Sequence, residues 1–156
     1  MSLVTFSSIS LLAIIYFVVM PKNLNTLELT MIIILVVYLD SNFMDISMLN
    51  LGTFKLTEKH HDQLTFYLTF TVLYPLFIAT SLNLLRSFRF NFIKILIPFI
   101  TISIIVGFDE LIRHLAVIEY KNWNWPADFL QWLIIWMICY FTHILFRKLV
   151  MKELKQ

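Results

Sequence analysis

The chain has 156 residues, of which 60% are hydrophobic and 14% are charged, against roughly 45–50% and 25% in an average soluble domain. This composition excludes an ordinary soluble domain and predicts an integral membrane protein. A formal net charge of +2 is too small to indicate nucleic-acid binding. The single cysteine, Cys139, cannot form a disulfide framework or a cysteine-based zinc site by itself.

The first apolar stretch predicts a membrane-spanning helix over residues 2–20, closed by Pro21. A cleaved signal peptide is the alternative interpretation. It is disfavoured because the stretch lacks a basic segment in front of it and a small-residue cleavage site after it. We therefore expect a retained helix.

The second and third helices are expected over residues 26–48 and 64–85, since about 20 apolar residues span a bilayer. Asn25 and Glu28 have the spacing of a capping box, which marks the start of the second helix. Pro75 lies inside the third and predicts a kink there, because neighbouring groups can satisfy the carbonyl that proline leaves free.

The fourth helix begins near Asn91, is apolar as far as Phe108, and is expected to continue to residue 120. The fifth is expected over residues 127–146, after Pro126 at a first-turn position. Together these stretches predict an all-α fold: one integral membrane domain over residues 1–156, a bundle of about five transmembrane helices.

Lysine and arginine predict the orientation of this bundle, because they concentrate in short cytoplasmic loops. Five spans place the two termini on opposite sides, and the basic residues gather on the side of the C-terminus. We therefore expect the N-terminus outside and the C-terminus in the cytoplasm, in a multi-pass protein of the cytoplasmic membrane. The residues on the basic side are Lys22, Arg86, Arg89, Lys94, Arg147, Lys148, Lys152 and Lys155, against Lys55, Lys59 and Lys121 on the other.

An aromatic belt is expected at the outer membrane surface, formed by Tyr120, Trp123 and Trp125. Glu110 precedes Tyr120 by ten residues, which corresponds to roughly 15 Å along a continuous helix. On that interpretation Glu110 lies within the hydrocarbon. The alternative is that the fourth helix stops near Gly107 and that residues 109–120 lie on the outer surface with solvated charges.

Charged side chains near this point form the candidate site, an intramembrane polar cluster. Ionisable residues inside a membrane are rare, face the bundle interior and pair with one another. Asp40 has a similar expected depth on the second helix, and Glu110 lies three residues before Arg113. We expect Asp40 or Glu110 to hold Arg113 in a buried triad, with His114 at its edge. A network that only fixes helix packing and a transport or catalytic role both remain open. The predicted cluster consists of Asp40, Asp109, Glu110, Arg113 and His114.

Two small residues on the fourth helix predict a packing face. Ser103 and Gly107 share one helical face with Glu110 and His114, because the four recur at steps of four, three and four. Small residues allow a neighbouring helix to approach closely.

Other polar residues give weaker signals. Glu58, His60, His61 and Asp62 could ligate zinc, but they lack the helical spacing of a metal site and are expected to form a solvated loop. His143 follows Cys139 by four residues and is expected to be a packing or interfacial histidine rather than half of a nucleophilic pair. No phosphate-binding, zinc-protease or hydrolase motif occurs, so we expect no catalytic residues, metal or cofactor.

Several segments resemble a family of small multi-pass membrane proteins from Bacillus and related spore-forming Gram-positive bacteria, whose activity is uncharacterised. The resemblance implies location and topology, and Glu110 and Trp123 match the family's most recognisable positions. The loop after the second helix departs from the family, which tends toward aromatic and glycine-rich residues there. The segments that carry the resemblance are MPKNLNTLELT, Tyr38–Leu39–Asp40, LYP at 73–75 followed by Leu82–Asn83, and Asp109 to Trp125 with Glu110, His114, Tyr120 and Trp123.

The sequence therefore predicts a non-enzymatic membrane protein that acts through helix–helix contacts with itself or a partner. Its expected surroundings are the lipid bilayer and a membrane-protein partner or a second copy, without nucleic acid. The alternative is a small transporter or a proton- or cation-conducting subunit that uses Asp40, Glu110, Arg113 and His114.

Overall fold

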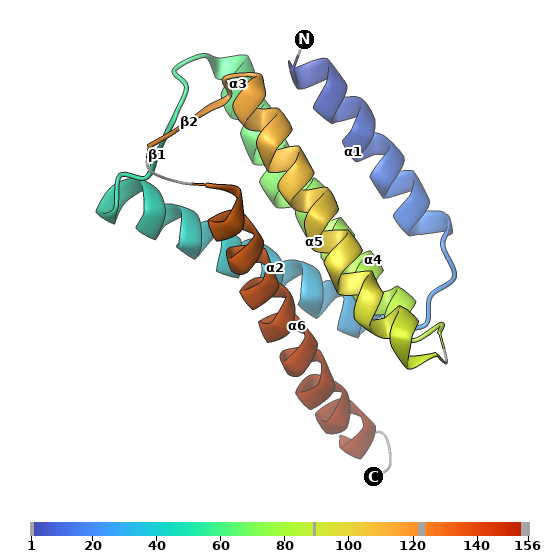
Figure 1. The fold of residues 1–156 in the computed structure, drawn as a ribbon. Coiled ribbons are helices and arrows are strands. Elements are labelled where there is room, and N and C mark those ends of the chain that lie inside the picture. Colours follow the sequence, from blue (N-terminus) through green and yellow to red (C-terminus); the bar gives the residue numbers. More distant parts are fainter. Residues whose placement is uncertain (1, 89, 122–123, 154–156) are drawn as a thin grey trace.

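A computed structural model describes residues 2–88, 90–121 and 124–153 of the chain (Figure 1). Helices form nearly all of it, and two π-helical turns, η1 and η2, extend or join them. The helical elements are α1 (Ser2–Val19), α2 (Thr26–Asp45), η1 (Ile46–Asn50), α3 (His60–Leu68), η2 (Thr69–Leu73), α4 (Tyr74–Leu85), α5 (Asn91–His114) and α6 (Trp125–Glu153).

Five helical stretches are long and apolar enough to cross a membrane, and the chain is accordingly a multi-pass helical membrane protein. The third stretch combines α3, η2 and α4, and lies at the centre of the bundle. Of its apolar window, 56% is buried, against 28% or less in the other four. The stretches are Ser2–Val19, Thr26–Asn50, His60–Leu85, Asn91–His114 and Trp125–Val150.

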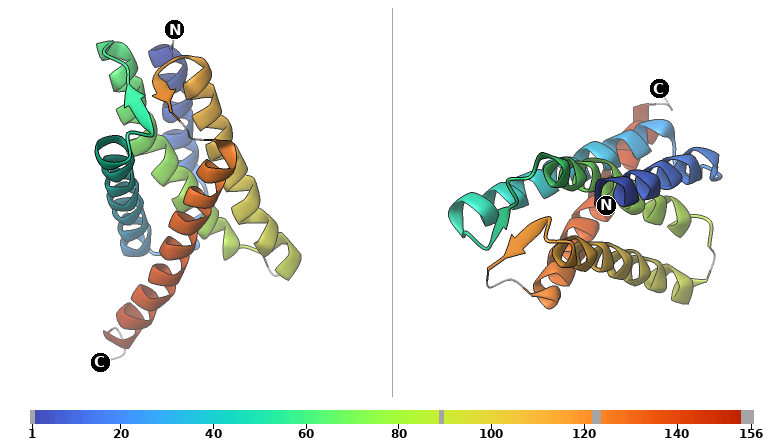
Figure 2. Two further views of the ribbon diagram at one scale, coloured as in Figure 1. Left: turned by 60° about the vertical axis from the view of Figure 1, so that its left-hand side comes forward. Right: turned by 90° about the horizontal axis from the view of Figure 1, so that it is seen from above.

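The central span packs against several of the other helices (Figures 1 and 2). Helix α4 packs against α1, α2 and α5, while α6 packs against α2 and α5. Helices α5 and α6 lie side by side near one end of the bundle and diverge toward the other end (Figure 2). We call the end at which they diverge the basic end. Its described basic residues are Lys22, Arg86, Lys94, Arg147, Lys148 and Lys152.

Local sequence signals explain where several helices begin. The Asn25 amide donates to Glu28 Oε2 over 2.8 Å at the start of α2, which confirms that half of the expected capping box. At the start of α6, the Ala127 amide donates to the side-chain oxygen of Asn124 over 3.3 Å. The π-helical turn η2 ends directly before Tyr74 and Pro75, where a kink was expected, and such a turn is one way to accommodate proline in a helix.

The fourth span is shorter than expected, since α5 ends at His114 rather than continuing to Tyr120. Ala116 takes a left-handed backbone conformation with φ of 53°, which an alanine adopts only at a local cost and which stops the helix. The chain then enters a short strand, β2 (Ile118–Tyr120), which pairs antiparallel with β1 (Phe54–Leu56). This tertiary pairing between two distant loops has no local signal in the sequence.

The loop before the third span also differs from expectation. Helix α3 already begins at His60, and the span is therefore longer than residues 64–85. Asp62 is buried and accepts a hydrogen bond of 2.6 Å from Ser2 Oγ. The expectation of a solvated loop is thus corrected at Asp62, which ties α1 to α3.

Candidate functional site

Helix α5 presents a buried face that contains an acidic residue. Ile102, Ile105, Asp109 and Ile112 are its buried residues in this half, and their steps of three, four and three place them on one side of a helix. Asp109 is 2% exposed. A carboxylate removed from solvent in this way needs hydrogen-bond donors, because burying a charge without partners is strongly unfavourable.

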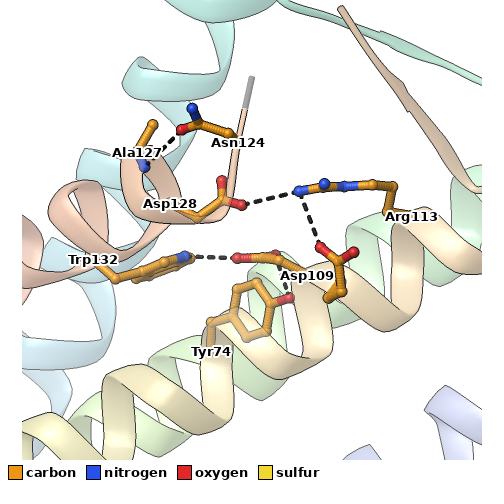
Figure 3. A network of polar contacts seen from close by, with 8 residues as sticks. Tyr74, Asp109, Arg113, Asn124, Ala127, Asp128 and Trp132 are labelled. Carbon is orange, nitrogen blue, oxygen red and sulfur yellow. Dashed lines mark hydrogen bonds and ion pairs between the residues drawn. The ribbon is translucent and has the colours of Figure 1, made fainter. Parts of the chain in front are cut away.

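Two aromatic side chains supply those donors (Figure 3). The Tyr74 hydroxyl of α4 donates to Asp109 Oδ1 over 2.6 Å, and Trp132 Nε1 of α6 donates to Asp109 Oδ2 over 2.9 Å. The two rings also contact each other edge to face, with centroids 4.9 Å apart. Asp109 therefore joins α4, α5 and α6 through one carboxylate whose two oxygens are both engaged.

A second set of charges lies beside this carboxylate (Figure 3). Arg113 Nη2 is 3.4 Å from Oδ2 of the buried Asp128 and 3.1 Å from Glu110 Oε2. Asp128 occupies the first turn of α6, where the partial positive charge of a helix N-terminus also favours an anion. We call Tyr74, Asp109, Arg113, Asp128 and Trp132 the Asp109 cluster.

Asp40 lies on α2 and is 2% exposed. It is close enough to Asp109 for the two carboxylates to interact electrostatically. Its Oδ1 atom has no hydrogen-bond partner among the described residues. Asp40 also lines a small cavity of about 150 Å³ together with Ser41, Asp45 and Thr71.

The ion pairs of Arg113 include Glu110, one of its two expected partners, but Asp128 takes the place expected for Asp40. The carboxylate contacts of Arg113 at salt-bridge distance are Glu110 and Asp128. Asp128 was not among the expected partners, because it lies at the start of another helix and only the fold brings it near.

The predicted packing face of Ser103, Gly107, Glu110 and His114 lies on the side of α5 that is exposed. The Glu110 side chain is 57% exposed, and a Cβ atom added at Gly107 would meet nothing within 4 Å. Glu110 also lies only four residues before the end of α5, about 6 Å along the helix. It is therefore nearer the C-terminal end of its span than the 15 Å expected for a longer helix.

The expected aromatic belt is described only in part. Trp125 begins α6 and is 64% exposed. Tyr120 ends strand β2, close to where α6 begins, and Trp123 lies outside the described residues. The placement of Trp125 at a helix end is compatible with an interfacial role.

Sequence reasoning missed Tyr74, Asp128 and Trp132. Tyr74 and Trp132 had a usable signal, because a tyrosine or tryptophan buried in a membrane bundle needs a partner for its O–H or N–H group. Which acid it reaches depends on the packing of α4 and α6 against α5, and no periodicity within one helix reveals that.

The other polar candidates do not gather into a metal centre. His61 Nε2 lies 3.4 Å from Asp62 Oδ2. Within the described ranges, no group of three or more histidine, cysteine or acidic residues is arranged to hold a metal ion.

Comparisons with known proteins do not assign this chain to a family, because no family model, curated protein or solved structure matches it.

Proposed function

We propose that the chain is a non-enzymatic protein of the cytoplasmic membrane that acts through helix–helix contact with a second copy or a partner protein. The contact surface is the exposed face of α5, here called the α5 contact face and defined by Ser103, Gly107, Glu110 and His114. The observation that carries the proposal is the open space over Gly107, beside an exposed serine one turn away.

Small residues have a specific meaning on a membrane helix. Lipid chains are as apolar as leucine, so helices associate mainly through close packing and interhelical hydrogen bonds. Because glycine and serine have small side chains, a helix that carries both on one face lets another backbone approach closely. Since α5 makes its own bundle contacts through Ile102, Ile105 and Asp109, Ser103 and Gly107 remain available to another chain.

Polar groups at the outer end of this face would orient the partner. Glu110 is paired with Arg113 over 3.1 Å but stays more than half exposed, and His114 is exposed one turn further along. Charged groups at the rim of an interface contribute to specificity and orientation more than to affinity. A partner with donors at its outer end would therefore be favoured in one orientation.

Cysteine crosslinking in native membranes tests this function. In a Cys139→Ala background, Ser103→Cys is compared with Ser8→Cys, which places the same change on an exposed serine of α1. A thiol-attached photocrosslinker is expected to form a discrete adduct, with a second copy or another protein, at position 103 and not at position 8. Equal adducts at both positions, or none at 103, would argue against a contact through α5.

Membrane orientation belongs to the same proposal. The basic residues at the C-terminal side support a cytoplasmic C-terminus and an outer N-terminus. Reporter fusions after Lys152 and within residues 50–63 should lie on opposite sides, with the first inside. A C-terminal reporter on the outer side would reverse the orientation.

The alternative function is proton or cation conduction, for which Asp40, Glu110, Arg113 and His114 were the expected groups. Its specific support is Asp40, which is buried with one oxygen unpartnered among the described residues and lines a cavity. Flux into liposomes measures it. A conducting protein loses proton or cation flux with Asp40→Asn while it stays folded, whereas a contact protein shows no flux above empty liposomes in either form.

The kinship with small multi-pass proteins of Bacillus and related Gram-positive bacteria is likewise a proposal. It rests on the resemblance of the segments around Asp40, Pro75 and Glu110, and the five apolar helices are compatible with it.

A further inference from the structure

A second feature lies at the basic end, far along the helices from the Asp109 cluster. A cavity of about 650 Å³ opens between α4, α5 and α6, where α5 and α6 diverge (Figure 2). Its volume falls within the range of roughly 300–1,000 Å³ that is typical of ligand sites. The residues that matter for its chemistry are Arg86, Lys94, Trp136, Tyr140 and His143.

Two cations line this cavity without a neutralising acid. Arg86 follows the last residue of α4, and Lys94 lies in the first turn of α5. Among the described residues, neither is within salt-bridge distance of a carboxylate, whereas Arg147 at the same end lies 3.7 Å from Glu28. Two uncompensated positive charges at one cavity mouth favour an anion.

His143 forms part of the wall and is 4% exposed. Its Nδ1 atom has no hydrogen-bond partner among the described residues. Buried polar atoms are nearly always satisfied by protein, water or ligand, so this ring nitrogen needs a partner that the described residues do not supply. A ligand oxygen could accept a hydrogen bond from the ring.

An acid near His143 does not cancel the positive charge of the cavity. Glu28 is close enough to His143 for an electrostatic interaction. However, Glu28 is already engaged by Arg147 and by the backbone amide of Asn25. Its charge is therefore largely compensated within α2 and α6.

The wall formed by α6 changes from apolar to polar along the helix. Trp136, Tyr140 and His143 share one face at steps of four and three, spanning about 10 Å. Trp136 and Tyr140 stack with centroids 5.3 Å apart, and Ile95 adds an exposed apolar side chain from α5. The polar end of this wall lies toward the basic end. A ligand with a polar head and an apolar tail, aligned with the membrane normal, would match this order.

We propose that this cavity binds the phosphate headgroup of an anionic phospholipid. Arg86 and Lys94 contact the phosphate from the mouth of the cavity, and His143 donates to it from the wall. An acyl chain runs past Ile95 and Trp136 into the gap between α5 and α6. A membrane lipid fits better than a soluble phosphate because the cavity combines cations with an apolar, aromatic wall, and basic pockets between membrane helices are known to bind anionic headgroups.

Binding of defined lipids to the purified full-length protein tests the proposal. Native mass spectrometry and displacement of a fluorescent phosphatidylglycerol compare phosphatidylglycerol, phosphatidylcholine and soluble glycerol phosphate. Phosphatidylglycerol is expected to bind most tightly. The double variant Arg86→Gln/Lys94→Gln should weaken it by roughly 10- to 30-fold, since each cation near a membrane surface contributes about a three- to fivefold change in affinity.

A matched control distinguishes binding at the cavity from attraction by the general positive charge of the basic end. Lys148→Gln/Lys152→Gln removes the same two charges at the same end of the bundle and should change the affinity less than about threefold. His143→Phe should weaken phosphatidylglycerol binding while helical content and elution volume stay unchanged. Equal losses in both double variants, equal affinity for phosphatidylcholine, or equally tight binding of glycerol phosphate would each overturn the proposal, the last by assigning the site to a soluble anion.

Discussion

Two adjacent acidic residues of α5 lie in different environments, because they lie on different faces of the helix. Asp109 is 2% exposed and accepts hydrogen bonds from two other helices. Glu110 is 57% exposed and pairs with Arg113 on its own helix. Consecutive residues on a helix point about 100° apart, because 3.6 residues complete a turn. The comparison shows that the role of an acid in a membrane helix depends on its face: one face holds the bundle together, and we propose that the other meets a partner.

Removal of the buried carboxylate should have the largest effect. Asp109→Ala leaves the Tyr74 hydroxyl and the Trp132 N–H without their acceptor and creates a small void. Interhelical hydrogen bonds in membrane proteins contribute about 0.6 kcal/mol on average and at most about 1.7. With the void added, we expect about 2–4 kcal/mol lower stability, measured by denaturant unfolding in detergent.

The matched change on the other face is Glu110→Ala. It removes an acid from the adjacent position, but the lost pair is largely exposed, and such pairs contribute about 0–1 kcal/mol. A loss for Glu110→Ala as large as that for Asp109→Ala would contradict the distinction between the faces.

Arg113 pairs with both the exposed Glu110 and the buried Asp128. Its removal should lower the free energy of unfolding by an intermediate amount. Arg113→Leu leaves the buried Asp128 without its cation, and breaking a buried pair costs about 3–5 kcal/mol. Since the Arg113 side chain is 29% exposed, solvent screening reduces the expected loss to about 1–2 kcal/mol. Lys121→Leu, outside the helices, is the control and should leave the unfolding midpoint nearly unchanged. Rescue of Arg113→Leu by Asp128→Asn would identify the unpaired carboxylate as the cause.

The sequence predicted much of this architecture for physical reasons. Apolar runs of the length of a bilayer identify the five helices, and the Asn25 and Glu28 spacing marked the start of α2. Helical periodicity grouped Ser103, Gly107, Glu110 and His114 on one face. It could not say which way that face pointed, because the direction depends on how α4 and α6 pack.

Long-range contacts account for what was missed. The strand at Ile118 forms only because it meets Phe54–Leu56 from a loop far away in the chain. Likewise, Tyr74 and Trp132 converge on Asp109 from two other helices. Such partners are set by tertiary packing, which overrides local propensity and cannot be counted along one segment.

Glu110→Gln should have a smaller effect on stability than the changes above, and it distinguishes a contact face from a conducting site. Glutamine keeps the shape of the side chain and most of its hydrogen bonds but cannot ionise. The protein should stay folded, and crosslinking through Ser103→Cys should persist. In a proton or cation conductor, the same change would remove flux in liposomes from a protein that remains folded, because only the carboxylate titrates.

Gly107→Leu changes the α5 contact face without altering the side of α5 that packs in the bundle. Tagged wild-type protein, Gly107→Leu and the matched Ser8→Leu on α1 are purified from native membranes, and co-purifying membrane proteins, including a second differently tagged copy, are quantified. Because nothing lies within 4 Å of the added Cβ at Gly107 and leucine has a higher helix propensity than glycine, the temperature of thermal unfolding should not fall. We predict that Gly107→Leu loses at least about fivefold of a specific partner, equivalent to about 1 kcal/mol, which Ser8→Leu retains. Equal recovery of the same partners by all three proteins would contradict a function through α5.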